Sequence, residues 1–411
     1  MTQPVVSYVI RSFPKLSESF VVRELLALQQ AGVPVEIWSL VPGGQAPLAQ
    51  VPSAAPLLPA VRHPPRGATG VIAMTLELLG IAVRRPVRAA RALAFAARWA
   101  IHERDPRQLA ALPYAAHLAT HARAPHLHAH FANTPATTAV LAAMLSRPGR
   151  TASYTGHARD LWVATSPQFL AAKTRRCAFA ISHSQFTLGV IAAALGTRRP
   201  GDPPLLVVTN GVDRPAAVAP TQERDRQLIV TTARLVEKKG VDTLIAAVAR
   251  LVGDGRTGVR VEIIGDGPLR DELRAQIVRL GVGEQVTLRG SQPPAAVYAT
   301  LARAWIFALP ARTARDGDTD GLPVALLEAM AYGAAVVATP IAGLPEAVRD
   351  GETGLLVAPD DPSALATALA RLLDDRPLRE RLAAAAAAQV AEHYDPARSA
   401  ATLAEHFRAQ R

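Results

Sequence analysis

The 411-residue sequence contains almost no cysteine and few aromatic residues. Cys177 is the only cysteine, which excludes a disulfide framework and a cysteine-based zinc site. Aromatic residues make up 5% of the chain, so the stacking surfaces that single-stranded nucleic acid requires are scarce. We therefore expect no nucleic-acid partner.

The sequence also lacks a recognisable leader, because no basic region with an apolar core and a cleavage site follows its first residue. The longest apolar stretch of the N-terminal half, residues 71–83, contains Glu77, and we expect it to be too short to span a bilayer. These features favour a cytoplasmic protein. The next segment, residues 84–98, places five arginines among apolar residues. It predicts peripheral contact with the cytoplasmic face of the inner membrane, or else a helix with arginine on its solvent face.

What the sequence does contain is positive charge on a globular composition. Arginine and lysine exceed aspartate and glutamate by 45 − 34 = 11, and the pI is about 10.5. Apolar residues make up 49% and charged residues 19%, which is typical of a folded globular chain. The length predicts two domains, and the charge favours an anionic partner such as a phosphorylated substrate.

Short β-branched runs alternate with helical patterns along the whole chain, which predicts parallel sheets covered by helices on both faces. The fold class is therefore α/β, with two Rossmann-like, doubly wound domains. We expect an N-terminal domain over 1–205, a C-terminal domain over 206–390, and a last helix over 391–411 that packs back toward the N-terminal domain. Pro-rich sequence predicts a linker near 197–226 and a loop over 41–66. The expected strands are 5–10, 35–40, 127–131, 152–156, 178–182, 228–233, 261–265, 286–290, 305–310, 335–339 and 354–358.

Two segments of the C-terminal half have the pattern of a phosphate site. Arg234 and Lys239 follow a predicted strand and precede a helix, where cations and helix N–H groups can hold a phosphate. Gly265 and Asp266 begin the turn GDGPL, in which glycine lets the backbone approach a ligand. The full G-x-G-x-x-G fingerprint is missing, so a nicotinamide cofactor is not favoured.

A third segment, DTDGLPVALLEAM at 318–330, places one acid before a helix and a second inside it. The backbone N–H groups of Gly321 and Leu322 precede a helix that begins near Pro323, and they favour a phosphate. Glu328, in the second turn, can accept two hydrogen bonds from a ribose diol. Asp320 lies before the helix and is predicted to reach the group beyond the phosphates.

The N-terminal half places polar residues at the ends of predicted strands. His157 and His130 end two strands, and Asp160 follows one turn after His157. We expect His130 and Asp160 to line the acceptor cleft. Asp160 can also orient His157 or favour a helix start. Lys15 and Ser17 follow the first strand and are either acceptor contacts or part of an N-cap near Ser17 or Ser19. His126 is interpreted as a surface residue.

Two patterns resemble metal sites, and we expect neither to bind a metal. His126, His128 and His130 share one face of a strand but spread over about 13 Å, too far for one ion even with His117 and His121 nearby. Asp316, Asp318 and Asp320 form overlapping D-x-D patterns, but they precede the helix of the third segment.

In this order the motifs resemble the donor domain of the family 4 glycosyltransferases, which have the GT-B fold. The resemblance rests on Arg234, Lys239, GDGPL and acid-GLP-x4-E-A-M-A, within residues 228–360. The stretches 11–25, 126–139 and 154–162 resemble the branch that makes exopolysaccharides of the colanic acid type. The resemblance covers nearly the whole chain except 41–110.

The resemblance implies retaining transfer of a sugar from a UDP- or GDP-sugar, bound in a cleft between the two domains, to a glycan or polyprenyl-diphosphate-linked acceptor. It implies no tightly bound cofactor. Arg234 and Lys239 would hold the diphosphate and Glu328 the ribose. His157 and Asp320 would lie at the transferred sugar, and Asp320 replaces the longer glutamate of the family. A sugar-nucleotide epimerase of the same fold and a non-catalytic, degenerate transferase are the alternatives.

Overall fold

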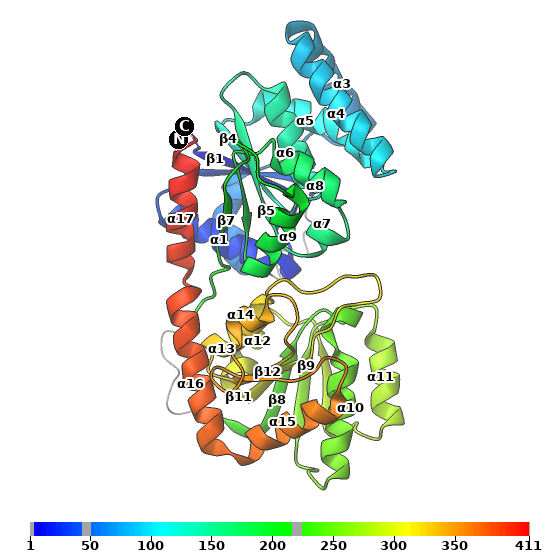
Figure 1. The fold of residues 1–411 in the computed structure, drawn as a ribbon, viewed down its shortest axis with the longest axis vertical. Helices are drawn as coiled ribbons and strands as arrows, with labels where there is room; N and C mark the ends of the chain where they lie inside the picture. The colour runs from blue at the N-terminus through cyan, green and yellow to red at the C-terminus, as the bar shows by residue number, and fades with distance from the viewer. Residues whose placement is uncertain (1–3, 43–50, 216–223, 411) are drawn as a thin grey trace. The chain divides into compact units, whose positions relative to one another are not determined.

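A computed structural model describes residues 4–42, 51–215 and 224–410. The chain divides into two compact units, shown in Figure 1. The N-terminal unit contains residues 1–209 and 396–411, and the C-terminal unit contains residues 210–395. The divisions at 209/210 and 395/396 compare with boundaries of 205/206 and 390/391 expected from the sequence.

The N-terminal unit is built on seven parallel strands in the order β3-β2-β1-β4-β5-β6-β7. Strand order reverses between β1 and β4, because β2 and β3 lie on one side of β1 and the later strands on the other. In an open parallel sheet, ligands bind at the carboxyl ends of the strands beside such a reversal. The strands are β1 (Val6–Phe13), β2 (Val35–Pro42), β3 (Val61–Arg62), β4 (His126–His130), β5 (Thr151–Gly156), β6 (Phe179–Ser182) and β7 (Leu205–Val207).

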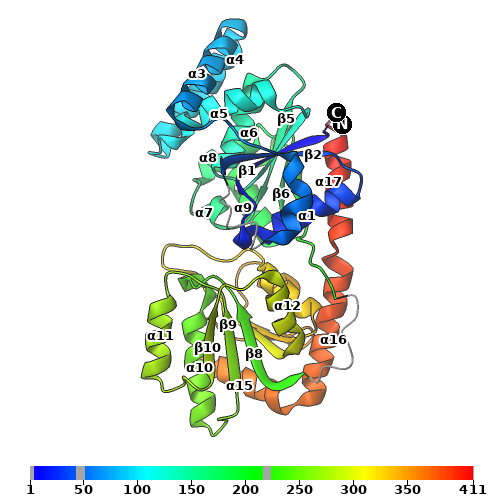
Figure 2. The same ribbon diagram turned by 180° about the vertical axis from the view of Figure 1, so that it is seen from behind.

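Helices cover both faces of this sheet (Figures 1 and 2). They are η1 (Leu16–Glu18), α1 (Ser19–Gln30), η2 (Pro52–Ala60), α3 (Gly67–Arg84), α4 (Pro86–His102), α5 (Arg107–His121), α6 (Thr134–Leu145), α7 (Arg159–Trp162), α8 (Pro167–Thr174), α9 (Gln185–Leu195) and α17 (Pro396–Arg408).

The C-terminal unit has a six-stranded parallel sheet in the order β10-β9-β8-β11-β12-β13, with its reversal between β8 and β11. Its strands are β8 (Asp225–Thr232), β9 (Arg260–Ile264), β10 (Val286–Gly290), β11 (Ala304–Leu309), β12 (Ala335–Ala338) and β13 (Leu355–Leu356). Its helices are η3 (Glu237–Lys239), α10 (Val241–Gly253), α11 (Arg270–Arg279), α12 (Pro294–Arg303), α13 (Val324–Ala331), α14 (Leu344–Ala347), α15 (Pro362–Asp374) and α16 (Arg376–His393).

All eleven expected strands are present, and the α/β class with two parallel sheets is confirmed. Two short strands were missed, because β3 lies in the segment expected to be a loop and β7 in the expected linker. Both lie at sheet edges, where a strand of two or three residues leaves little periodic signal. The parts of those segments at 43–50 and 216–223 lie outside the described residues.

The apolar stretch 71–83 belongs to a longer helix than the sequence suggested. Helix α3 has 18 residues with a mean hydropathy of 1.4, and only 17% of them are buried. By length and composition alone it could cross a membrane, so the expectation that this segment is too short was wrong. A break at Arg85 separates it from α4, whose first residue is Pro86.

Histidines fix the last helix, α17, on the sheet of the N-terminal unit. Phe407 of α17 is fully buried and packs against His126 and His128 of β4, with ring centroids 5.6 Å and 5.1 Å away. The interpretation of His126 as a surface residue was wrong, because β4 lies between β1 and β5 in the middle of the sheet. Both nitrogens of its ring are 2.7 Å from hydroxyl groups, those of Thr151 and Ser153.

Acid should weaken the N-terminal unit through these buried imidazoles. Burial lowers the pKa of His126 to about 3, against about 6.5 in an unfolded chain. Between these values the unfolded chain binds more protons, so the free energy of unfolding falls as the pH decreases, by up to about 1.4 kcal/mol per pH unit. Urea unfolding across this window should show the slope. His126→Asn should flatten it and the half-exposed control His102→Asn should not. Equal slopes in both variants would contradict this assignment.

Candidate functional site

The loop between β8 and α10 carries three cations at the carboxyl end of a central strand. Arg234 is exposed, while Lys238 is buried and Lys239 is nearly so. Gly240 ends the loop with a φ of +62°, and a Cβ there would lie 1.8 Å from the carbonyl oxygen of Pro310. Only glycine fits this close approach, so the loop after β8 is held against the end of β11.

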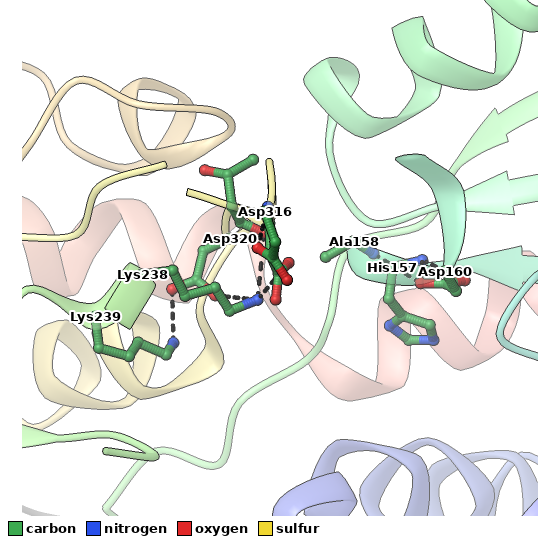
Figure 3. A network of polar contacts seen from close by, with 9 residues as sticks. His157, Ala158, Asp160, Lys238, Lys239, Asp316 and Asp320 are labelled. Atoms are coloured by element: carbon green, nitrogen blue, oxygen red, sulfur yellow. Dashed lines mark hydrogen bonds and ion pairs between the residues drawn. The ribbon is translucent and has the colours of Figure 1, made fainter. Parts of the chain in front are cut away.

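The two lysines form ion pairs with the loop that follows β11 (Figure 3). Lys239 Nζ lies 2.6 Å from Asp320, and Lys238 Nζ lies 3.2 Å from Asp320 and 3.1 Å from Asp318. Lys238 also donates to the carbonyl oxygen of Thr319 at 3.3 Å. Two of the predicted site residues, Lys239 and Asp320, are therefore in direct contact.

These contacts decide the charge of Asp320. Burial alone would raise the pKa of its carboxyl, but the ammonium groups of Lys239 and Lys238 reverse this effect and lower the pKa below its ordinary value. Asp320 is thus an anion at neutral pH, although only 6% of it is exposed. Sequence reasoning missed Lys238, the residue that joins both aspartates.

The three aspartates of the D-x-D pattern make two different kinds of contact. Asp318 and Asp320 face Lys238, whereas the carboxylate of Asp316 accepts a hydrogen bond from the backbone N–H of Asp318 at 2.9 Å. A cation at Asp318 and Asp320 would have to displace an ammonium group.

The turn between β9 and α11 packs against the loop that follows β8. Gly265 has a φ of +139°, and a Cβ there would lie 1.8 Å from the carbonyl oxygen of Ala233. The backbone N–H of Leu235 donates to the carbonyl oxygen of Asp266 at 3.0 Å. The carboxylate of Asp266 instead pairs with Arg270 at 2.7 Å and is half-exposed. This turn therefore fixes the neighbouring loop through its backbone.

Helix α13 begins where the sequence predicted, with Pro323 as its N-cap residue. Leu322 and Glu328 are both buried, with 8% and 9% exposed. The hydroxyl of Tyr298 donates to Glu328 at 3.2 Å, and its ring stacks on Tyr332. Gly321 accepts a hydrogen bond from the N–H of Gly343 at 2.8 Å. The acid of the second turn is thus oriented by a tyrosine that the sequence did not indicate.

In the N-terminal unit, a chain of hydrogen bonds runs inward from His157. Its Nε2 is 3.0 Å from Nδ1 of His130, and Nε2 of His130 is 3.0 Å from a carboxylate oxygen of Glu24. The hydroxyl of Tyr8 donates to the same oxygen at 2.7 Å. Glu24 and Tyr8 were not singled out from the sequence.

The charges along this chain follow from burial and contact. Burial lowers the pKa of His157 well below its usual value, and the neighbouring His183 and His130 lower it further. Burial would raise the pKa of Glu24, but the charge and hydrogen bond of His130 lower it to about 2. Glu24 is therefore a carboxylate that can only accept, and His157 is neutral.

A carboxylate at one end fixes the proton positions along the chain. Glu24 accepts from Nε2–H of His130. In the neutral tautomer of His130 that carries its proton on Nε2, Nδ1 has a lone pair. That lone pair accepts from Nε2–H of His157. The remaining nitrogen of His157, Nδ1, then carries a lone pair and can accept a hydrogen bond.

Asp160 holds the loop around His157 and does not touch its ring (Figure 3). Its carboxylate accepts from the backbone N–H groups of Ala132 at 2.7 Å, Ala158 at 2.9 Å and His157 at 3.3 Å. Burial raises the pKa of this carboxyl, and these N–H groups oppose the rise. Asp160 therefore joins the ends of β4 and β5.

The loop after β1 departs from the expected N-cap. Helix α1 begins at Ser19 with Glu18 as its N-cap residue, and no side chain caps it. Lys15 pairs with Glu18 at 2.6 Å and is half-exposed, and Ser17 is exposed. The cap interpretation of Ser17 and Ser19 was wrong, while both Lys15 and Ser17 lie at the carboxyl end of β1.

Two groups of possible metal ligands occur among the described residues. In the first, Glu24, His128 and His130, every ring nitrogen is within 3.0 Å of a protein oxygen or nitrogen. In the second, Glu77 of α3 pairs with His117 at 3.0 Å and His121 at 2.9 Å on α5. Both groups are explained as contacts that join elements of the fold.

Comparison with known proteins identifies the C-terminal unit. Residues 214–389 match the family model described as glycosyl transferases group 1. A putative colanic acid biosynthesis glycosyltransferase of Salmonella typhimurium is 42% identical over 142 residues, which is 34% of this chain and 35% of the relative. A GDP-mannose-dependent phosphatidylinositol monomannoside mannosyltransferase of Mycolicibacterium smegmatis is 37% identical over 202 residues, which is 47% of this chain and 52% of the relative. The chain thus spans about a third to a half of these relatives.

Solved structures show the fold of the whole chain. HepE of Anabaena, solved with UDP-glucose, has a TM-score of 0.69 at 18% identity and covers 99% of this chain and 100% of its own. Sucrose-phosphate synthase of Thermosynechococcus elongatus has a TM-score of 0.70 at 16% identity, with 99% of each chain covered. The resemblance to family 4 glycosyltransferases of the exopolysaccharide branch is confirmed. The chain has the GT-B fold, and residues 214–389 of its C-terminal unit match the model of the group 1 glycosyl transferases.

Proposed function

We propose that this protein is a retaining glycosyltransferase that moves a sugar from a nucleotide sugar to a glycan or lipid-linked saccharide in the synthesis of a surface polysaccharide. One observation carries the proposal. Two of the residues that the resemblance assigns to the donor site, Lys239 and Asp320, are in contact beside the strand-order reversal between β8 and β11, where doubly wound sheets bind ligands. The relatives are transferases by name, which favours transfer over epimerisation.

The donor is proposed to be a nucleoside diphosphate sugar. HepE has been solved with UDP and with UDP-glucose, and the mycobacterial relative is named for GDP-mannose. Arg234 is exposed and can take a diphosphate bidentately. Lys239 can share its ammonium group between Asp320 and a phosphate oxygen, because an ammonium has three donors. The N–H groups before α13 add positive charge.

In the proposed reaction, the bond from the anomeric carbon to the diphosphate breaks and a bond to the acceptor oxygen forms on the same face. The acceptor proton passes to the leaving diphosphate. The protein stabilises charge: Arg234 and Lys239 balance the leaving group, and the anionic Asp320 faces the positive sugar ring. The resemblance assigns His157 to the same reaction, in which its lone pair on Nδ1 can accept from a sugar hydroxyl.

No divalent metal is proposed for this step. Lys238 already supplies a positive charge 3.1 Å from Asp318 and 3.2 Å from Asp320. This ammonium occupies the place that a metal ion would take between the two carboxylates.

A panel of UDP- and GDP-sugars tests the function directly. We expect one of them to release free nucleotide, with transfer to an added glycan detected by mass spectrometry, and EDTA to leave the rate unchanged. Asp320→Glu should alter which sugar is used, because it restores the longer acid of the family. Conversion of a donor to its epimer without transfer would instead support the epimerase alternative. The absence of turnover with every donor, in the native chain and in Asp320→Glu, would refute the proposal.

Arg234→Ala should weaken the binding of UDP or GDP at least about tenfold, because a hydrogen bond to a charged phosphate contributes about 1.5–3 kcal/mol. Lys239→Ala should have a similar effect. Isothermal titration calorimetry measures both, with Arg279→Ala as the control, since Arg279 is an exposed arginine of the same unit. Affinities within twofold of the native chain in both site variants would exclude this diphosphate site.

Glu24→Gln should disorder the proton positions of His157 without changing its contacts, because an amide can donate as well as accept. Nitrogen-15 NMR of imidazole-labelled protein reports each tautomer. We expect a protonated Nε2 and an unprotonated Nδ1 at His157 in the native chain, and a mixture in the variant. Glu103→Gln serves as a control, because Glu103 contacts Ser166, away from this chain of hydrogen bonds. Identical His157 signals in the native chain and Glu24→Gln would show that Glu24 does not set the tautomer.

A further inference from the structure

Helix α3 presents an apolar stripe to solvent. Ile72, Leu76, Leu79 and Val83 are 58%, 62%, 56% and 83% exposed. Their spacing of four, three and four residues places them on one face of the helix, and no charged residue lies between them on that face. The buried residues of α3, Met74 and Ile81, lie on the opposite face.

The stripe is fixed to the unit and does not stand alone. Glu77 in the middle of α3 pairs with two histidines of α5, and α3 packs along both α4 and α5. Figures 1 and 2 show α3 and α4 side by side at one end of the N-terminal unit. A helix held in this way can lie along a membrane surface, whereas crossing the membrane would require these contacts to break.

A second feature, a cationic cavity of about 1020 Å³, lies beside α4. Phe95 and Trp99 form part of its wall, and no aspartate or glutamate lines it. Its six arginines are Arg88, Arg91, Arg98, Arg175, Arg176 and Arg199.

Few of these charges are neutralised. Within the described part of the chain, only Arg175 of the six forms an ion pair, with Asp202 at 3.1 Å. Arg176 and Arg98 lie over the rings of Phe95 and Trp99, at 4.3 Å and 5.4 Å. Burial and the nearby Arg98 lower the pKa of Arg176, as expected where no acid compensates. Concentrated, uncompensated arginine beside apolar surface fits phosphate groups at a lipid–water boundary.

Helix α4 connects the two features. It supplies Arg88, Arg91 and Arg98 to the cavity, and it exposes Val87 and Ile101, which are 62% and 79% exposed. A helix with arginine beside exposed apolar residues is typical of segments that lie in a membrane interface.

We propose that α3 and α4 dock the N-terminal unit on an anionic phospholipid bilayer, with the α3 stripe in the interface and lipid phosphates in the arginine cavity. The sequence suggested contact through 84–98 alone. The structure adds the α3 stripe and three cavity arginines outside α4, so that apolar and cationic surfaces act together. Arg175 and Arg176 directly follow α8, and Arg199 follows α9.

A second copy of this chain is the rival occupant of the stripe. Four aliphatic side chains cover far less than the roughly 1,000 Å² that a stable protein interface buries. A symmetric dimer through α3 and α4 would also leave the arginine charges without partners. The cationic cavity therefore favours lipid over a second copy.

Vesicle co-sedimentation with the full chain tests the charge. We expect binding to phosphatidylglycerol vesicles that salt weakens, and little binding to phosphatidylcholine vesicles. Arg91→Glu with Arg98→Glu should reduce binding at least about twenty-five-fold, because each basic residue near the surface contributes about fivefold and the new glutamates repel the same lipids. Arg274→Glu with Arg279→Glu on α11 makes the same charge change on another surface and should change binding less than threefold. Equal losses in the two double variants, or equal binding to both lipids, would overturn the proposal.

A second variant tests the stripe. Ile72→Ser, Leu76→Ser and Leu79→Ser together remove exposed apolar groups, so the fold should persist, as circular dichroism can verify. Vesicle binding should fall at least about tenfold while UDP affinity stays unchanged, which separates this proposal from the donor site. Sedimentation velocity should show a monomer in both forms. A dimer lost in the variant, membrane retention after carbonate extraction, or binding of inorganic pyrophosphate without vesicle binding would each assign the surface differently and overturn the proposal.

Discussion

The buried ammonium group of Lys238 holds the C-terminal site together. Removing an ammonium from water costs several kcal/mol unless oxygen atoms surround it. Here those oxygens come from Asp318, Thr319 and Asp320, all on the loop after β11. The loop cannot move away without leaving a buried charge unpaired, so Lys238, together with Lys239, fixes the position of Asp320 and the entry into α13.

The N-terminal unit also contains a buried charge that polar partners surround, but there the charge is negative. There the buried charge is the carboxylate of Glu24, and its partners are the hydroxyl of Tyr8 and the imidazole of His130. In both units the buried charge lies beside the strand-order reversal and fixes a neighbouring polar group, Asp320 in one unit and His130 in the other. Groups fixed in this way need little reorganisation when charge develops in a reaction, which is the main source of electrostatic catalysis.

The sequence carried most of the fold, because buried parallel strands are continuous apolar runs and all eleven were recognised. It did not carry β3 or β7, which are too short for periodicity to register. The sequence also suggested wrongly that His126 lies at the surface, because histidine is a polar residue. It does not show that the hydroxyls of Thr151 and Ser153 lie beside the ring and satisfy both of its nitrogens when it is buried. Strand order, which the sequence did not reveal, makes β4 central and its histidines buried.

For the candidate site, motifs indicated the loops, and they did not indicate the contacts between loops. Lys238 is separated from Asp318 by 80 residues, and Glu24 from His130 by 106. A signal for Lys238 was present, since lysine occurs only at positions 15, 173, 238 and 239 in a chain otherwise rich in arginine. Arginine could not replace it, because its larger planar fork does not fit among three oxygens that a compact ammonium can contact. Nothing comparable in the sequence indicated Glu24, because it is a single acid among the mostly apolar residues of a predicted helix.

The contacts of Lys238 also explain why an aspartate can stand where the family has a glutamate. One methylene adds about 1.5 Å of reach. At Asp320, the shorter side chain places its carboxylate 2.6 Å from Lys239 and 3.2 Å from Lys238. A glutamate would carry that carboxylate past the lysines, toward the group beyond the phosphates. The aspartate thus gains a firmly held charge and loses reach. A donor sugar must compensate with a group that extends toward Asp320, or with charge that acts over the longer distance. In the proposed reaction, the donor preference therefore depends on the distance between one fixed carboxylate and the transferred sugar.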